Sequence, residues 1–188
     1  MNKPILDACC GGRMFWFDKQ NHNVIFGDLR QFETELCDGR SFVVQPDVVF
    51  DFTKLPYPDG EFKLVVFDPP HLVKVGNKSY TAIKYGKLDK DWRETLGKGF
   101  SECWRVLDDY GVLIFKWSER DITLSKIRDL FPAPPLFGHP TNGGKTTHWL
   151  CFMKLPVCAD CGAVLNPDEC VECSSCEQES MERAFSND

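Results

Sequence analysis

Four short apolar runs in the sequence each end at an aspartate, and this pattern constrains the fold more than any other feature. The runs begin near residues 4, 23, 47 and 62 and are bounded by turn-forming residues, as is typical of buried strands. In open α/β sheets, ligands bind beyond the carboxyl ends of the strands. We therefore expect four carboxylates to gather at one edge of a sheet and to face a ligand there. The four acids are Asp7, Asp28, Asp51 and Asp68.

The spacing of apolar residues changes to that of a helix over residues 92–107. Apolar side chains recur there at steps of 4, 4, 3 and 4 residues, which places them on one face of an α-helix. A second helix is predicted over residues 121–130, where Pro132 ends it. No helix is predicted between the second and fourth strands, because the pattern supports none there. The apolar positions of the first helix are Trp92, Leu96, Phe100, Cys103 and Leu107.

Three more strands are predicted later in the chain, at residues 112–115, 136–139 and 147–154. The last two flank Asn142-Gly-Gly144, a sequence typical of a hairpin turn. Apolar strands that alternate with helices indicate an α/β protein with a parallel sheet. The predicted fold class is therefore α/β, a Rossmann-like and mostly parallel sheet with an antiparallel terminal hairpin.

The loop after the first strand contains two adjacent glycines, in Ile5-Leu-Asp-Ala-Cys-Cys-Gly-Gly12, and glycine lets the backbone approach a ligand closely. Acids follow the second and third strands, and Asp68-Pro69-Pro70-His71 follows the fourth. This order resembles the class I S-adenosylmethionine-dependent methyltransferases over roughly residues 3–155. The Asp68-Pro-Pro-His71 element is similar to the Asp/Asn-Pro-Pro-aromatic motif of the amino-methyltransferase branch. That branch methylates exocyclic nitrogens, typically adenine N6 or cytosine N4, and in some members a glutamine amide.

The resemblance implies that S-adenosylmethionine binds beside the first three strands and that the motif after the fourth strand carries the catalysis. Asp28 would accept hydrogen bonds from ribose hydroxyls. Asp68 and the Pro69 carbonyl would accept hydrogen bonds from the target amine, with the prolines fixing the direction of that carbonyl. His71 would stack on a flipped or single-stranded base. The implied cofactor residues are Asp7, Cys9, Gly11, Gly12, Asp28, Asp51 and Phe52, and the implied catalytic residues are Asp68, Pro69, Pro70 and His71.

Two residues depart from the pattern of the family. Arg13 stands where the family has the last glycine of Asp-x-x-x-Gly-x-Gly, and its side chain is expected either to crowd the cofactor or to reach the carboxylate of the cofactor. His71 replaces the usual Tyr, Phe or Trp and stacks less strongly on a base. The short distance from Gly12 to Asp28 predicts a brief first helix. Arg13 also supports an alternative interpretation, a catalytically inactive binding protein with a methyltransferase fold.

The distribution of charge permits a nucleic-acid substrate, although the formal net charge is −6. Residues 156–188 carry eight acids and one base, whereas residues 1–155 carry 20 acids and 21 bases. Residues 72–98 hold seven bases against three acids, with Tyr80 and Tyr85 among them, and cations interleaved with aromatic rings suit a nucleic-acid strand. We expect DNA rather than RNA as the substrate, methylated at adenine N6. RNA, cytosine N4 and a protein amide are the alternatives.

Residues 156–188 contain five of the ten cysteines. They read Cys158-Ala-Asp-Cys161 and Cys170-Val-Glu-Cys173-Ser-Ser-Cys176, and paired Cys-x-x-Cys turns are typical of a structural Zn²⁺ site. The predicted ligands are Cys158, Cys161, Cys173 and Cys176, with Cys170 as the alternative fourth ligand. The predicted organisation is a methyltransferase domain over residues 1–155 and a zinc-ribbon-like tail over residues 156–188. The tail is expected to dock on the main domain or on a protein partner rather than to grip phosphates.

The remaining expectations concern location and packing. No apolar stretch is long enough to span a membrane and no secretory signal is visible, so we expect a cytoplasmic protein without a membrane partner. Met14-Phe-Trp-Phe17 favours a short buried helix over a base-stacking site. Lys116 and Trp117 follow the fifth strand at the active edge, and Trp117 is expected to pack beneath the rim of the site.

Overall fold

The computed structural model describes residues 3–76, 79–141, 147–158, 160–165 and 176. The chain divides into two compact units, Met1–Lys154 and Leu155–Asp188. Each unit has its own internal contacts, so the two are described separately. Within the described residues, no helix is long and apolar enough to cross a membrane.

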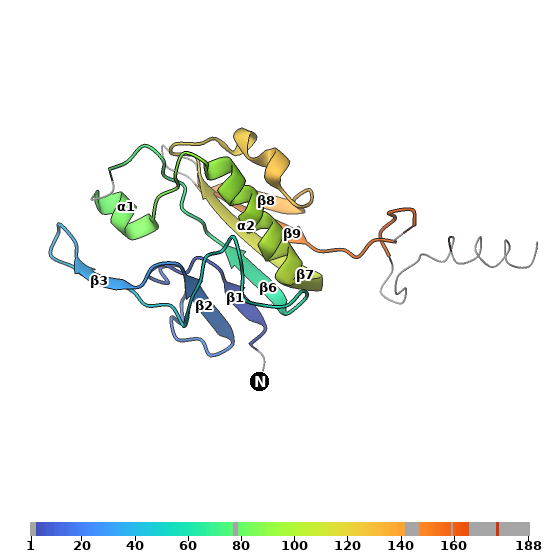
Figure 1. Ribbon diagram of the computed structural model, residues 1–188, viewed down its shortest axis with the longest axis horizontal. Helices are drawn as coiled ribbons and strands as arrows, with labels where there is room; N and C mark the ends of the chain where they lie inside the picture. The colour runs from blue at the N-terminus through green and yellow to red at the C-terminus, as the bar shows by residue number, and fades with distance from the viewer. Residues whose placement is uncertain (1–2, 77–78, 142–146, 159, 166–175, 177–188) are drawn as a thin grey trace, which may run out of the picture. The chain divides into compact units, whose positions relative to one another are not determined.

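The first unit is built on a seven-stranded sheet with the strand order β5-β2-β1-β6-β7-β9-β8 (Figure 1). Strands β5, β2, β1, β6 and β7 run parallel to one another, whereas β9 pairs antiparallel with both β7 and β8. This confirms the predicted Rossmann-like α/β class with an antiparallel terminal hairpin. The bounds are β1 Ile5–Asp7, β2 Val24–Asp28, β5 Val48–Val49, β6 Phe62–Phe67, β7 Leu107–Ser118, β8 Phe137–Thr141 and β9 Thr147–Met153.

Helix α2, Trp92–Val106, forms where the four-residue spacing predicted it and packs against β6 and β7 (Figure 1). Leu96, Phe100 and Cys103 of this helix are at most 1% exposed. They join the main apolar core, in which rings of the sheet and the helix meet edge to face, as aromatic pairs prefer. The core therefore fixes the central strands whose carboxyl ends carry the candidate site.

A separate hairpin follows β2 and was not predicted from the sequence. Strands β3, Phe32–Glu35, and β4, Ser41–Val44, pair antiparallel. Their buried side chains pack against the short helix α1, Tyr80–Tyr85, whose first turn is capped when the Ser79 hydroxyl accepts a hydrogen bond from the Ala82 N–H. The hairpin and α1 thus form a small apolar cluster of their own beside the end of β2 (Figure 1).

The helix predicted over residues 121–130 is wrong, because the segment forms two separate 3₁₀ turns, η1 Leu124–Lys126 and η2 Arg128–Leu130. Asp121, read as its cap, instead accepts hydrogen bonds from the N–H groups of Val73 and Lys74. The Ile122 carbonyl accepts a hydrogen bond from the Trp117 indole. With these groups bonded to other segments, the chain cannot begin a regular helix at Asp121.

The region around Met14–Phe17 also differs from its prediction. Residues 8–23 form turns rather than a short buried helix, and Phe17 is fully exposed. The stretch between Gly12 and Asp28 therefore holds no first helix at all, only turns followed by β2. The third predicted strand shortens to Val48–Val49, since the chain turns towards the site immediately after it.

The described part of the second unit is a short turn closed by backbone hydrogen bonds. Val157 and Val164 form an antiparallel bridge, and the Cys158 N–H donates to the Ala163 carbonyl at 2.8 Å. Gly162 adopts a φ of 73°, in the left-handed region that favours glycine. The turn therefore depends on a glycine directly after Cys161.

Candidate active site

The carboxyl ends of β1, β2, β5 and β6 meet at a pocket of about 490 Å³, a volume typical of small-molecule sites. The loops after these strands line one part of it, and residues 84–98 of α1, the following loop and α2 line another. Nine of the predicted cofactor and catalytic residues lie in its wall, which leaves Asp7 and Gly12 outside. The nine are Cys9, Gly11, Asp28, Asp51, Phe52, Asp68, Pro69, Pro70 and His71.

Asp7 lies beneath the pocket rather than in its wall. Its side chain is completely buried and accepts hydrogen bonds from the Trp16 indole at 2.7 Å and from the Cys9 N–H at 3.2 Å. Burial raises the pKa of this carboxyl to about 7, against the lowering effect of the two hydrogen bonds. Asp7 therefore organises the loop after β1, and its proton is gained or lost near neutral pH.

Asp28 is held by its own neighbours. One carboxylate oxygen accepts from the backbone N–H and the Nε of Arg30, at 2.8 and 3.1 Å. The other accepts from the Gly11 N–H at 2.9 Å. Arg30 also donates to the Ile83 carbonyl of α1 at 3.1 Å. Ribose hydroxyls would have to compete with these partners, so Asp28 serves first to join the glycine loop, β2 and α1.

Asp51 has a more open carboxylate. One of its oxygens accepts from the N–H and the hydroxyl of Thr53, both at 2.8 Å. The other oxygen, Oδ2, accepts no hydrogen bond within the described residues. Asp51 is exposed and Phe52, the next residue, lies beside it in the wall. Of the carboxylates that the sequence placed at this edge for the cofactor, Asp51 is the one with an open oxygen.

Asp68 forms an ion pair with Lys116. The sequence placed this lysine at the same edge of the sheet but did not predict the pair. Lys116 of β7 donates from Nζ to Oδ2 of Asp68 at 2.6 Å, and both side chains are about four-fifths buried. Burial raises the pKa of Asp68, and the charge and hydrogen bond of Lys116 oppose that rise. Oδ1 of Asp68 accepts no hydrogen bond within the described part of the chain, so it is available to a ligand.

The rest of the motif is held by the loop after α1. Gly86 adopts a φ of 75°, and a Cβ on it would lie 2.9 Å from the Pro70 ring, so this loop packs closely on the second proline. The His71 ring lies 5.8 Å from that of Tyr85 and 6.2 Å from that of Trp117. Burial and the nearby Lys116 lower the pKa of His71 to about 4. The imidazole is therefore neutral at neutral pH. Trp117 is fully buried, as predicted.

Arg13 neither crowds the pocket nor points into it. Its φ is 53°, a value that favours the glycine usual at this position of the family motif. The guanidinium donates to the Lys19 and Gln45 carbonyls at 2.7 and 2.9 Å and to Asp47 at 2.8 Å. It also lies over the Phe26 ring. Both expectations for this side chain were wrong, because its hydrogen bonds hold it on the far side of the glycine loop, outside the pocket wall.

Sequence reasoning missed Arg30 as a part of the wall, whereas residues 84–89 belong to the 72–98 stretch that it favoured for substrate recognition. Arg30 stands two residues after the acid of β2, a spacing at which a long cation can bond the same carboxylate. That spacing is a usable signal. For residues 84–89 the signal is the cations and aromatic rings of the 72–98 stretch, while the packing of Gly86 on Pro70 that brings them to the wall is a tertiary contact.

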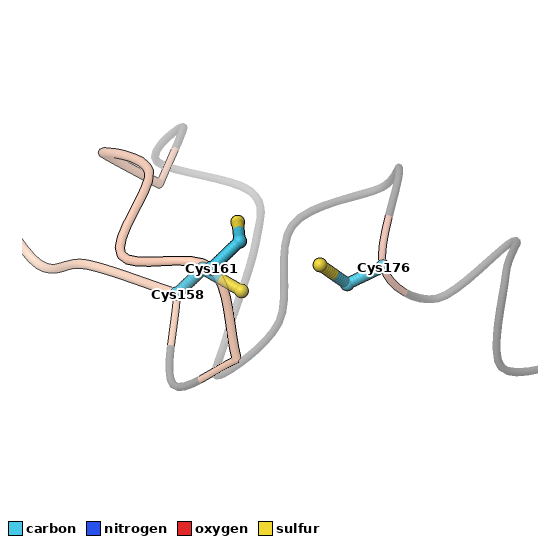
Figure 2. A group of neighbouring side chains, drawn as sticks. All are labelled: Cys158, Cys161 and Cys176. Atoms are coloured by element: carbon cyan, nitrogen blue, oxygen red, sulfur yellow. The ribbon is translucent and has the colours of Figure 1, made fainter.

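Three cysteine sulfurs gather in the second unit (Figure 2). The Sγ atoms of Cys158, Cys161 and Cys176 all lie within 4.8 Å of one another. This separation suits thiolates that share one tetrahedral Zn²⁺, since each Zn–S bond is about 2.3 Å. The two other predicted candidates, Cys170 and Cys173, lie outside the described residues.

The residues of the pocket fit S-adenosylmethionine, the cofactor that the sequence implies. Gly11 has a φ of 48°, so its loop makes a turn that few other residues adopt and brings backbone rather than a side chain to the pocket. Asp51 offers an open carboxylate oxygen and Phe52 an apolar ring on the same wall. This combination suits the ribose and the base of an adenosyl group, with Asp51 in the part expected of Asp28.

The sheet order and the pocket at its carboxyl edge resemble those of the class I methyltransferase fold. The PH0226 protein from Pyrococcus horikoshii OT3 has a similar structure, with a TM-score of 0.51 and 15% sequence identity over 80% of this chain and 81% of that chain. The [4+2]-cyclase SpnF is less similar, with a TM-score of 0.43 and 10% identity over 80% of this chain and 73% of that chain. At these identities the likeness concerns the fold alone. The sequence matches no protein family and no curated protein.

Proposed function

We propose that the chain is an S-adenosylmethionine-dependent methyltransferase that acts on an exocyclic amine of a nucleic-acid base, with adenine N6 in DNA as the preferred substrate. One observation carries the proposal. Asp68-Pro-Pro-His71 lies at the carboxyl end of β6 in the wall of the pocket, and Oδ1 of Asp68 has no partner within the described residues. A carboxylate oxygen and a rigid carbonyl side by side suit an amine that must donate two hydrogen bonds.

The chemistry explains why the motif needs these groups. The lone pair of an exocyclic base amine is delocalised into the ring, which makes the nitrogen a poor nucleophile. Hydrogen bonds to Oδ1 of Asp68 and to the Pro69 carbonyl favour a more tetrahedral nitrogen with a localised lone pair. The bound cofactor supplies an electrophilic methyl group. The residues of the motif contribute position and fixed dipoles, which account for much of the acceleration in such sites.

The surroundings of the motif support a base as the substrate. The neutral His71 ring and the nearby Tyr85 ring lie in the pocket wall, and every base has a face that stacks on such rings. Lys84 lies 5.4 Å from the Tyr85 ring centre and adds a cation at the same wall, where a phosphate group would be attracted. Lys98, also in the wall, is already paired with Glu94, so the cationic side of the pocket is the last turn of α1.

For the tail we propose a structural Zn²⁺ site held by Cys158, Cys161, Cys173 and Cys176, with Cys170 as the alternative fourth ligand. The gathering of three sulfurs within 4.8 Å supports it. A tail whose sequence holds few large apolar residues needs another source of folding free energy, and metal binding supplies that in small domains. The eight acids of residues 156–188 make a protein a better partner for this tail than a phosphate backbone.

The proposed activity is tested first by calorimetric titration with S-adenosylmethionine and S-adenosylhomocysteine, and then by transfer of tritiated methyl groups. The acceptors are matched DNA and RNA oligonucleotides with adenine or cytosine as the only exocyclic amine, and a protein amide substrate. We expect micromolar cofactor binding and transfer to adenine in DNA. Binding without transfer to any acceptor would favour the inactive binding protein, an interpretation that Arg13 no longer supports.

Asp68→Asn tests directly whether the carboxylate of Asp68 is needed for methyl transfer. The variant keeps the size of the side chain but replaces one acceptor oxygen by a donor, so transfer should fall by about 100-fold or more, with cofactor affinity nearly unchanged. Asp38→Asn is the matched control, because Asp38 pairs with Arg40 outside the pocket. Wild-type single-turnover rates from Asp68→Asn, measured with a melting curve that shows the variant folded, would remove Asp68 from the mechanism.

A further inference from the structure

Lys116 contacts Asp68 of the Asp68-Pro-Pro-His71 motif. The function proposed above assigns no role to this lysine. It lies on β7, next to the β6 strand that ends at Asp68. Its Nζ donates to Oδ2 of Asp68 at 2.6 Å, which leaves Oδ1 open. The lysine itself does not line the pocket. It therefore contacts the acid from behind, on the side away from a ligand.

Two aromatic rings fix the position of this ammonium group. Nζ of Lys116 lies 5.5 Å from the centre of the Phe15 ring and 5.6 Å from that of Trp149, within the range of cation–π attraction. The two rings contact each other edge to face, with their centres 5.5 Å apart. Trp149 is also the direct cross-strand partner of Lys116 on β9. The loop after β1, β7 and β9 thus converge on a single ammonium group.

The charges around Asp68 make this contact consequential. Asp7 lies close enough to Asp68 for each negative charge to disfavour the other, and the Cys9 thiol is close as well. His71, in the same motif, is neutral near pH 7 because its pKa is about 4. Among the described residues, Lys116 is the cation that offsets the burial of the Asp68 charge.

We propose that Lys116 is a positioning residue for Asp68, holding Oδ2 of the carboxylate from behind so that the charged group presents Oδ1 to the amine of the substrate. The inference rests on the proposed methyltransferase function, since it assigns Oδ1 to the target amine. Two consequences follow. Asp68 stays ionised at a lower pH than its burial alone would allow, and its carboxylate cannot rotate to turn Oδ1 away from the pocket.

The test compares Lys116→Met, Lys116→Gln and Lys116→Arg with Lys63→Met. Methionine fills the space between the rings without a charge, glutamine does so with a polar end, and arginine keeps the charge. Lys63→Met is the matched control, because Lys63 pairs with Asp108 far from the pocket. The first readout needs no substrate. It is the pH titration of the Asp68 carboxyl carbon by NMR, assigned by its absence in Asp68→Asn.

We expect the titration midpoint of Asp68 to move up by about one pH unit or more in Lys116→Met and Lys116→Gln, and to stay in place in Lys116→Arg and Lys63→Met. The second readout is the pH profile of kcat for methyl transfer. Its acid limb should move up by the same amount in the two uncharged variants and return to the wild-type position in Lys116→Arg. A purely structural role would lower kcat equally at every pH, with no movement of the limb.

The outcomes separate the two hypotheses. An unmoved Asp68 midpoint in the folded uncharged variants overturns the role of Lys116, whatever the activity. A moved midpoint, without methyl transfer by the wild-type protein to any acceptor, overturns the proposed function and with it the part of Lys116 in transfer. If both uncharged variants fail to fold, the double variant Lys116→Met with Asp68→Asn decides. It should fold, because it leaves no unpaired buried charge, and a failure to fold would show that Lys116 acts only in packing.

Discussion

The two units of the chain differ in whether the residues that build the fold are also those that bind a ligand. In the first unit, large side chains such as Phe67, Phe100 and Phe115 are at most 1% exposed, and the pocket residues lie at the ends of the strands that this core holds. In the second unit, Cys158 and Leu165 are the buried apolar residues among those described. Fold and ligand site are therefore separable in the first unit, whereas in the tail the proposed zinc ligands would serve both.

This difference has a physical basis in the amount of apolar surface each unit buries. Full burial of a large apolar side chain contributes about 1.5–3 kcal/mol, and the first unit has many such residues in one cluster. The described tail residues Val157 and Val164 are each 56% exposed. The core of the first unit therefore needs no ligand, whereas the proposed zinc site makes metal a condition for the fold of the tail.

Metal removal is the strongest test of the comparison. A chelator should release one zinc per chain and abolish amide protection in residues 155–165, because structural zinc supplies on the order of 10 kcal/mol to small domains. The first unit should keep its melting temperature. Plasma mass spectrometry gives the zinc content and hydrogen exchange gives the protection of each segment.

Single cysteine variants supply the control for that experiment. Cys161→Ser should lose both zinc and protection, whereas Cys37→Ser should lose neither, since Cys37 is also exposed but lies outside the cluster. Cys170→Ser and Cys173→Ser then decide the fourth ligand. Full protection of the tail after complete zinc removal would contradict the comparison.

Asp7→Asn tests whether a buried carboxyl beneath the site lowers the stability of the first unit. The carboxyl of Asp7 has a pKa of about 7 in the folded chain against an ordinary 3.8. Between these values the folded state keeps a proton that the unfolded state has lost, so stability falls as pH rises from about 4 to 7 and stays low above that. The contribution is on the order of 4 kcal/mol.

The variant removes this pH dependence because asparagine does not titrate. Relative to the wild type, Asp7→Asn should therefore gain unfolding free energy between pH 5 and pH 8, even though it gives up one of the two hydrogen bonds to Asp7. Denaturant unfolding at both pH values measures the difference, and the exposed Asp38→Asn serves as the control. An equal pH dependence in Asp7→Asn and wild type would refute the raised pKa.

Asp51→Asn and Asp28→Asn test which pocket carboxylate binds the cofactor and which one stabilises the fold. Asp51 has an open oxygen, so its variant should weaken S-adenosylmethionine binding by about tenfold or more with little change in stability. Asp28 holds Gly11 and Arg30, so its variant should lose about 1–3 kcal/mol of stability. Calorimetry and denaturant unfolding measure the two effects, and the reverse assignment would restore Asp28 as the main ribose acceptor.

The sequence predicted those parts of the fold that depend on local pattern. Apolar runs ending in acids placed β1, β2 and β6 and the motif at their edge, and the helical period placed α2 within one residue of its end. The cysteine spacing predicted the three sulfurs that gather in the tail. In each case the signal is a period or a spacing that needs no knowledge of distant contacts.

The parts that escaped prediction are set by contacts between distant segments. Asp121 accepts hydrogen bonds from the backbone of residues 73–74 and so begins no helix where local pattern placed one. Lys116 finds Asp68 across two neighbouring strands, 48 residues away in sequence. The β3–β4 hairpin gains its burial from α1, whose position depends on the folded site. Local sequence carries no record of such partners.

Arg13→Gly has the smallest expected effect. It tests whether Arg13, in the glycine loop, serves the fold and not the binding of the cofactor. Glycine relieves the cost of a left-handed φ at residue 13, about 1 kcal/mol, but it gives up the hydrogen bonds to Lys19, Gln45 and Asp47. The two effects nearly cancel, so stability should change by about 1 kcal/mol or less. Cofactor affinity should stay within about twofold, because the guanidinium lies outside the pocket wall. Calorimetric titration measures the affinity, and a gain of tenfold would show that Arg13 obstructs the site after all.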